Sequence, residues 1–304
     1  MSRLLRNCLI LLALNAWVIV YLRTLPPVES TFRWKRTTLE RHRANCDVLV
    51  LGSSHALYGI RPDQLSPQAI NMALVSQDTH YDWEMLKKWG PDLPELRDVV
   101  EVISPKRLYF ELDNSFEEWR SDFYLAELGL PPSHWTLGRR LKSVFPRLAF
   151  DDTVLLQNPR MMTEFQRCKS DDGWCRKPSE PITPEAAKVT LNRHGMDGVR
   201  PAAISEEVIA QIRNISQWCR EHQVTYVLVN PPHHHWYRDQ ADQKRLKQCL
   251  DRVRQIGQSE ASLWIDEFDS TDYVDADFHD PDHLSELGAT KLSERIGELI
   301  KPYL

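Results

Sequence analysis

We predict a three-layer α/β/α protein in which helices cover both faces of a mostly parallel β-sheet. Short apolar runs alternate along the 304-residue chain with segments whose apolar residues recur at the helical period. Small or polar residues follow directly after two of the apolar runs, as is typical of strands that end at a functional edge of such a sheet. With 42% hydrophobic and 27% charged residues, the chain can bury a full core.

Four apolar runs predict the strands, which are residues 47–51, 107–112, 224–229 and 262–266. Helical periodicity and terminal signals predict the helices, which are residues 79–89, 137–144, 205–219, 246–257 and 287–299. The alternation breaks between about 121 and 200, where Pro, Trp, Arg and Asp are frequent. We interpret 121–200 as an insertion, a lid or a partner surface, within one domain of residues 46–304.

Residues 1–24 are predicted to be a membrane-spanning signal anchor. Asn7 to Leu22 carries no charge, follows Arg3 and Arg6, and with two preceding leucines reaches the lower end of the length of about 20 residues that spans a bilayer. A cleaved signal peptide is the alternative, although VYLRTLPPVES offers no clean cleavage site. Short anchors usually leave the bulk of the chain outside, so we expect a single-pass protein of the inner (cytoplasmic) membrane with a periplasmic domain. Basic residues on both sides of the apolar segment leave the orientation open.

Residues 25–45 are polar and basic, and we interpret them as a juxtamembrane stalk. Further along, Cys168 and Cys175 flank the polar segment KSDDGW. A disulfide between them fits an oxidising compartment, and two free thiols fit the sequence equally well. The net charge of −5 gives no sign of a nucleic-acid partner.

Gly52, Ser53, Ser54 and His55 follow directly after the first predicted strand. A plain turn is one interpretation, because small polar residues are common in turns. The other is that one serine is a nucleophile. A serine hydroxyl needs a neighbouring base for this role, and the base needs a carboxylate that orients it.

The segment FHDPDHLSELGA, residues 278–289, supplies a base and a carboxylate. Asp280 precedes His283 by three residues, and Ser285 can cap the predicted last helix. Asp282 is the alternative orienting carboxylate. We prefer Asp280, because a side chain directly adjacent to His283 usually points elsewhere.

Together the Gly-x-Ser block and the D-x-x-H segment resemble those of the SGNH (GDSL-type) esterases and acyltransferases. The stretch GSSHALYGIRPDQL is most similar to their membrane-anchored branch. That branch includes proteins that O-acetylate alginate and other exported glycans, and the D-alanylation protein of teichoic acid synthesis. The resemblance covers about residues 46–120 and 205–304, and it implies the SGNH/flavodoxin-like form of the predicted fold.

The resemblance implies roles for individual residues. Ser54 takes the place of the nucleophile, His283 that of the general base and Asp280 that of the residue that orients it. Ser53 stands where the hydrolases usually have Asp. The backbone amide of Ser54 becomes the first oxyanion donor, and Asn114, after the second predicted strand, is the candidate for the family's third donor.

Two features of the pocket stay open. The family's second oxyanion donor is a Gly, and neither 71–73 (NMA) nor 76–77 (SQ) contains one. His55, His233 and His234 lie where the rim of an acyl or glycan pocket is expected. A solvated loop is the alternative for the last two.

The predicted function is that of a serine-dependent O-acyltransferase or esterase. It acts on acyl groups, chiefly acetyl, of a cell-envelope or exported glycan, and the resemblance implies a membrane-bound O-acyltransferase partner as acyl donor. We expect no cofactor. One alternative is an inactive assembly protein that keeps the fold. The other is a metal-dependent hydrolase whose site is formed by His279, Asp280, Asp282, His283 and the histidines of 233–235.

Overall fold

The computed structural model describes residues 30–144, 168, 170–199 and 203–301, together with scattered positions between 5 and 21. Five parallel strands form one sheet in the order β2-β1-β3-β4-β5. They are β1 (Val48–Gly52), β2 (Ile70–Asn71), β3 (Asp98–Val102), β4 (Thr225–Asn230) and β5 (Leu263–Asp266). Because the strands are parallel, all their carboxyl ends lie at one edge of the sheet, where a site is expected.

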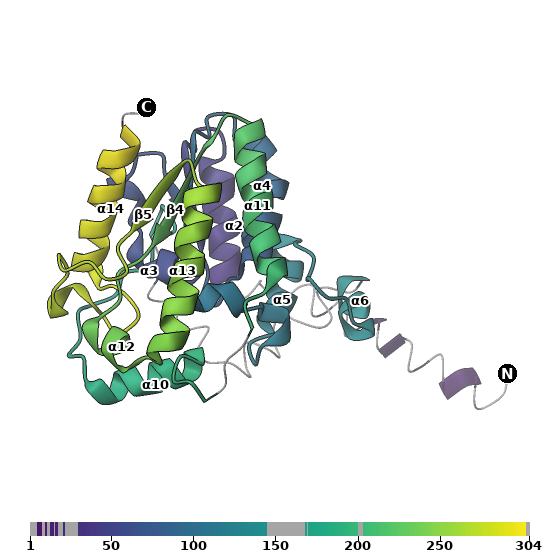
Figure 1. The fold of residues 1–304 in the computed structure, drawn as a ribbon. Coiled ribbons are helices and arrows are strands. Elements are labelled where there is room, and N and C mark those ends of the chain that lie inside the picture. Colours follow the sequence, from purple (N-terminus) through teal and green to yellow (C-terminus); the bar gives the residue numbers. More distant parts are fainter. Residues whose placement is uncertain are drawn as a thin grey trace.

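Helices cover both faces of the sheet, as predicted (Figure 1). One face packs against α2 (Thr31–His42), α4 (Thr79–Trp89), α11 (Glu206–Glu221) and α13 (Gln243–Glu260). The other packs against α3 (Ser54–Gly59) and α14 (Glu286–Ile300). Successive β1 residues alternate between the two buried clusters: Leu49 and Leu51 belong to the first, and Val48 and Val50 to the second. A parallel sheet buried on both faces explains why β1 reads as an unbroken apolar run.

The second predicted strand, residues 107–112, is wrong. Residues 107–112 form no strand; short 3₁₀ turns at Pro105–Tyr109 and Leu112–Asn114 occupy this region. The strand is β3 (Asp98–Val102), in the middle of the sheet. Its sequence DVVEV includes two carboxylates and is therefore not an unbroken apolar run. The sequence analysis did not predict a strand here, although the strand is buried along its whole length.

Glu101 tolerates its place in β3 because tertiary partners surround it. The hydroxyl of Tyr226 on β4 donates to Glu101 Oε2 over 2.5 Å, and Arg107 lies 3.4 Å from Oε1. Burial, together with the nearby carboxylate of Asp82, raises the pKa of Glu101 to about 8, and Arg107 opposes this rise. These partners come from other strands and turns, so no local sequence pattern predicts that Glu101 is buried.

The stalk interpretation is wrong for residues 31–42, which form α2 and pack on the domain. Phe32 and Leu39 are buried, and so is the side chain of Lys35. The Lys35 ammonium donates to the backbone oxygens of Asn71 (2.6 Å) and Gly173 (2.7 Å). The charged residues of this segment therefore do not show that it is solvated. Lys35 can be buried because carbonyl groups accept the hydrogen bonds of its ammonium group.

Most of the predicted anchor, residues 1–24, lies outside the described residues. In the part of the chain that the structure describes, no helix combines the length and apolar character needed to cross a membrane.

The described parts of the predicted insertion, 121–200, contact the rest of the chain at several points. They include most of α5 (Arg120–Phe123), α6 (Leu137–Val144) and α10 (Pro184–His194); α10 contacts α12 (His235–Gln240). Cys168 and Cys175 are joined in a disulfide. The loop that it closes lies against α3, because the Trp174 indole N–H donates to the carbonyl of Tyr58 over 2.9 Å.

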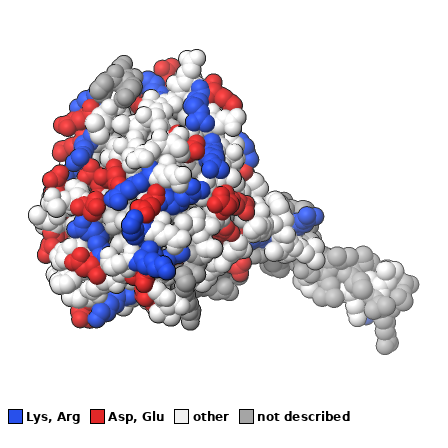
Figure 2. Space-filling model, viewed as in Figure 1, with Lys and Arg blue, Asp and Glu red and all other residues white. Residues whose placement is uncertain are grey.

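Basic and acidic side chains are interspersed on the face shown in Figure 2, without a continuous stripe of one sign. This distribution matches the small net charge of −5. The face therefore presents no electrostatic footprint of the kind that follows a phosphate backbone.

Candidate active site

The turn from β1 into α3 places Ser54 at the carboxyl edge of the sheet. Gly52 ends β1 with φ of 131°, a value that side-chain-bearing residues rarely adopt. A Cβ there would also lie 3.0 Å from Cβ of Ala56 and 3.2 Å from the carbonyl oxygen of Val102. Ser53 is the residue before α3, and Ser54 is its first residue. Glycine thus allows the sharp turn that presents the Ser54 hydroxyl.

The loop before α14 holds His283 in a defined orientation. Asp280 Oδ1 accepts the backbone N–H groups of Asp282 and His283, both over 2.8 Å. The same carboxylate lies 2.9 Å from His283 Nδ1 through its Oδ2 atom. Ser285 caps the following helix by accepting the N–H of Gly288, as predicted. The D-x-x-H spacing therefore closes a small turn in which Asp280 fixes both the backbone and the ring.

His283 joins this loop to α3, 229 residues away in the sequence. Its Nε2 atom lies 2.8 Å from Ser54 Oγ. An ionised Asp280 can only accept, so His283 Nδ1 carries the proton and its Nε2 lone pair faces the Ser54 hydroxyl. This is the geometry in which an imidazole removes a proton from a serine.

The charges around His283 favour its protonated form. Burial by itself lowers the pKa of His283, but the carboxylates of Asp280 and Asp282 outweigh burial and raise that pKa above its ordinary value. For Asp280, burial raises the pKa and His283 opposes it, with a net pKa well below the usual range. The orienting carboxylate therefore stays ionised across the neutral range.

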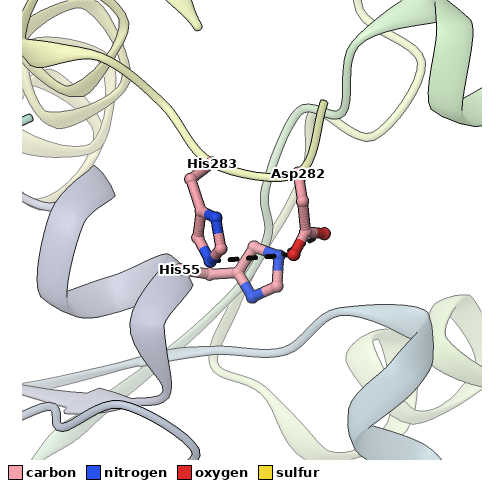
Figure 3. A group of neighbouring side chains, drawn as sticks. All are labelled: His55, Asp282 and His283. Atoms are coloured by element: carbon pink, nitrogen blue, oxygen red, sulfur yellow. Dashed lines mark hydrogen bonds and ion pairs between the residues drawn. The ribbon is translucent and has the colours of Figure 1, made fainter. Parts of the chain in front are cut away.

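Asp282 is surrounded by imidazole rings. Its Oδ1 atom lies 3.0 Å from His55 Nε2 and 3.3 Å from His233 Nε2, and its Oδ2 atom lies 3.3 Å from His194 Nε2. His283 Nε2 is 3.6 Å from Oδ2. Figure 3 shows His55 on α3 and His283 on the loop both connected to Asp282. The carboxylate thereby ties together α3, α10, the end of β4 and the loop before α14.

His55 is positioned as a donor to Asp282 and does not face Ser54 Oγ. Its Nδ1 atom lies 3.3 Å from the hydroxyl of Ser53. Burial lowers the pKa of His55 to about 4, against the opposing effect of Asp282. A neutral ring that donates from Nε2 and accepts at Nδ1 satisfies both contacts. Asp282 is engaged in this cluster, whereas Asp280 contacts Nδ1 of His283.

A cavity of about 390 Å³ lies in front of Ser54. Its wall includes the predicted site residues Ser54, His55, Asp280 and His283. His233 and His234 do not line it, contrary to the expectation. His233 lies buried beneath the site against Asp282, and His234 caps α12 by accepting the N–H of Trp236. Their rings are held by neighbouring elements that the sequence does not show to be close.

Asn114 does not reach the cavity. Its side chain is exposed and donates to Glu111 Oε2 over 2.7 Å. The expectation failed because it was counted from the wrong strand. After the actual third strand, β3, the wall instead contains Ser104. The Ser104 side chain is buried, and its hydroxyl has no hydrogen-bond partner among the described residues.

Ser76 is a second residue of the cavity wall that the sequence did not single out. Its φ of 58° lies in the left-handed region, where glycine is favoured and a serine is uncommon. A search for Gly in residues 71–77 does not find Ser76, because this position is marked by its left-handed backbone conformation and not by its residue type. Strained backbone of this kind is often found at functional sites.

Hydrogen bonds already engage some of the ligand atoms of the metal alternative. The Nε2 lone pair of His283 faces Ser54, and His279 points away, with its Nδ1 atom 2.8 Å from the carbonyl of Pro178. A second group of converging ligand atoms is formed by His234, His235 and Asp275. In this group His234 Nδ1 accepts a backbone N–H, so Nε2 carries the proton and donates to Asp275 over 3.1 Å.

Comparison with known proteins finds resemblance at the level of structure. No family model matches the chain, and no curated protein matches its sequence. A structure described as that of an acylhydrolase from Bacteroides fragilis is 10% identical, with a TM-score of 0.45 over 89% of this chain and 95% of that one. A GDSL-like lipase from Bacteroides thetaiotaomicron is 9% identical, with a TM-score of 0.42 over 90% of this chain and 100% of that one. At these values the functional assignment depends on the side chains themselves.

Proposed function

We propose that this protein is a serine-dependent esterase or O-acyltransferase that works through an acyl-enzyme on Ser54. One observation carries the proposal, namely the continuous row Ser54 Oγ, His283 and Asp280, with contacts of 2.8 and 2.9 Å at the edge of a cavity. Three residues from two distant segments meet in the order that nucleophilic catalysis requires.

The first half of the reaction forms the acyl-enzyme. Ser54 Oγ attacks the ester carbonyl while His283 Nε2 takes the hydroxyl proton, and Asp280 stabilises the resulting imidazolium. The tetrahedral intermediate then collapses, the bond to the leaving alkoxide breaks, and His283 returns its proton to that alkoxide. The Ser54 amide, the Ser76 amide and the Ser104 hydroxyl are the donors that we assign to the developing oxyanion.

The second half consumes the acyl-enzyme. Water or an acceptor hydroxyl attacks the Ser54 ester carbonyl and gives its proton to His283, which passes the proton to Ser54 Oγ as the acyl bond breaks. Water as nucleophile gives hydrolysis, and a glycan hydroxyl gives transfer. We propose transfer of acetyl to a cell-envelope or exported glycan, with a membrane-bound acyl donor protein as partner.

The proposed location is outside the cytoplasm, anchored by residues 1–24 in the inner membrane. The disulfide between Cys168 and Cys175 supports this location, because disulfides persist in oxidising compartments and are rare in the cytosol.

A serine-directed fluorophosphonate probe tests the nucleophile on the detergent-solubilised full-length chain. The wild type and Ser53→Ala should be labelled, whereas Ser54→Ala should not, and mass spectrometry should locate the adduct on Ser54. Ser53→Ala is the matched control, since it removes a neighbouring hydroxyl from the same turn. Labelling that persists in Ser54→Ala contradicts the assignment. An unlabelled wild type favours an inactive assembly protein.

A further inference from the structure

The cavity wall carries more positive charge than its own carboxylates balance. Lys106, Lys177 and Arg193 are among its lining residues, and they come from the turn after β3, the segment after the disulfide, and α10. Three elements far apart in the sequence thus bring cationic side chains to the front of Ser54.

The carboxylates of the wall already have partners. Asp280 is held by His283 at 2.9 Å, and Asp282 by the surrounding histidines at 3.0–3.6 Å. Glu117 pairs with Arg120 over 2.8 Å. Arg107, a further cation of the wall, is taken up by Asp82 and Glu101 behind it. None of these carboxylates forms an ion pair with Lys106 or Arg193, although the charges of Asp282 and Glu117 act on Lys106 from a greater distance.

Lys106 is the most informative of these cations. Its side chain is half-buried, and its ammonium lies 4.7 Å from the centroid of the Phe110 ring. Among the described residues it makes no hydrogen bond or ion pair. Burial lowers the pKa of Lys106, Asp282 raises it, and Arg193 lowers it again. Arg193 is exposed and lines the same cavity, so two like charges face one ligand space.

Apolar surface lies beside the charge. Tyr58, Phe110, Phe116 and Trp119 line the same cavity, and Phe116 is 76% exposed. Aromatic rings in a cavity wall beside cations suit a ligand that has both a carbon skeleton and a negative group.

We propose that the cavity binds an ester substrate or acyl acceptor that carries an anionic group, a carboxylate or a phosphate, which Lys106 and Arg193 bind. This inference rests on the proposed function and specifies the substrate class of the same site. An anion between the two side chains relieves their repulsion and gives each a charge-assisted partner. Such recognition is stronger in a partly buried cavity than on the open surface.

Three acetyl esters that differ chiefly in charge test the inference: 4-acetoxybenzoate, its neutral methyl ester, and 4-acetoxyphenyl phosphate. The full-length protein should hydrolyse one of the two anionic esters with a higher kcat/KM than the neutral ester. Which anion is preferred distinguishes a carboxylate-bearing from a phosphate-bearing natural substrate. Added salt should reduce this preference, since it screens the attraction.

The variants Lys106→Gln and Arg193→Gln should each lower the ratio of anionic to neutral kcat/KM by about tenfold, the scale of a lost charged contact. Lys188→Gln is the matched control, because Lys188 is an exposed cation on α10 outside the cavity lining, and both rates should stay as in the wild type. A wild type that prefers the neutral ester, or ratios unchanged in both variants, overturns the inference while leaving the proposed function intact. If none of the three esters is hydrolysed and the probe does not label Ser54, the proposed function itself is overturned.

Discussion

Two carboxylates in one loop, Asp280 and Asp282, have opposite surroundings. The Asp280 side chain is 35% exposed and contacts one imidazole, whose other nitrogen faces Ser54. The Asp282 side chain is 2% exposed and has four imidazoles within 3.6 Å. In the proposed mechanism, a carboxylate supports catalysis when the imidazole it orients keeps a free lone pair at a cavity. The same group becomes an anchor when buried donors surround it.

Replacing Asp280 by Asn should give the largest loss of activity. Asn keeps an oxygen for the two backbone N–H groups but no longer accepts as a carboxylate from His283 Nδ1, so the ring loses its tautomer and the imidazolium loses its counter-charge. We expect kcat to fall by about a thousandfold or more, with little change in unfolding free energy. The measurement is steady-state ester hydrolysis, with Asp275→Asn, an exposed carboxylate at another histidine, as control. An unaffected kcat would contradict the role of Asp280.

Replacing Asp282 by Asn should act mainly on stability. The amide offers one acceptor, and its NH₂ group faces imidazole donors, so buried N–H groups lose their partner. We expect the free energy of unfolding to fall by about 3 kcal/mol, the scale of buried donors that lose their hydrogen bonds to a charged acceptor. Urea denaturation measures it, and Asp269→Asn, an exposed member of a surface pair, is the control. If Asp282→Asn proves as stable as the wild type, the anchor interpretation is wrong.

The oxyanion assignment can be tested on two residues, Asn114, which follows the second predicted strand, and Ser104, which follows β3. Ser104→Ala should lower kcat by about tenfold to a hundredfold, since it removes one buried donor at the cavity. Asn114→Ala should change kcat by less than about twofold, because that side chain is exposed and bonded to Glu111. Single-turnover acylation rates provide the test. A larger effect at Asn114 than at Ser104 would return the donor to the residue predicted from the sequence.

His283, which contacts Asp280, and His55, which contacts Asp282, should also respond differently to pH. His283 must be neutral to accept the proton, and its pKa is raised, so kcat/KM should fall on acidification at a pH above the ordinary pKa of a free histidine, about 6.5. His55 has its folded pKa lowered to about 4, so between about 6.5 and 4 the unfolded chain binds the extra proton. Its contribution to stability is present above pH 6.5 and is lost as the pH falls, by up to about 1.4 kcal/mol per pH unit.

Denaturation and activity measured over the same pH series can tell these effects apart. In Asp282→Asn the acid limb of kcat/KM should move to lower pH, because one of the carboxylates that raise the pKa of His283 is gone. If the limb stays in place, Asp282 does not act on His283 electrostatically.

Sequence alone was enough for the parts of the protein whose signals are local. The unbroken apolar runs predicted β1, β4 and β5, and the helical period predicted α4, α6, α11, α13 and α14. Ser54, Asp280 and His283, which the structure brings into contact, were singled out for the same reason: a turn after a strand and a D-x-x-H loop before a helix each lie within a few residues. Gly257 shows the limit of such signals. It seemed to end its helix, but α13 continues to Glu260, and this glycine instead allows close packing against Trp264.

Only the tertiary structure decided where polar groups are buried. Glu101 in β3, Lys35 in α2 and Asp282 beneath the site each look solvated in the sequence. Each is buried because donors or acceptors arrive from distant elements: Tyr226 for Glu101, the carbonyl of Gly173 for Lys35, and three histidines from other segments for Asp282. A buried charge is stable only with such partners. No local pattern encodes these partners, so the sequence indicated the three residues of the proposed mechanism, and only the tertiary structure showed the buried contacts and the cavity around them.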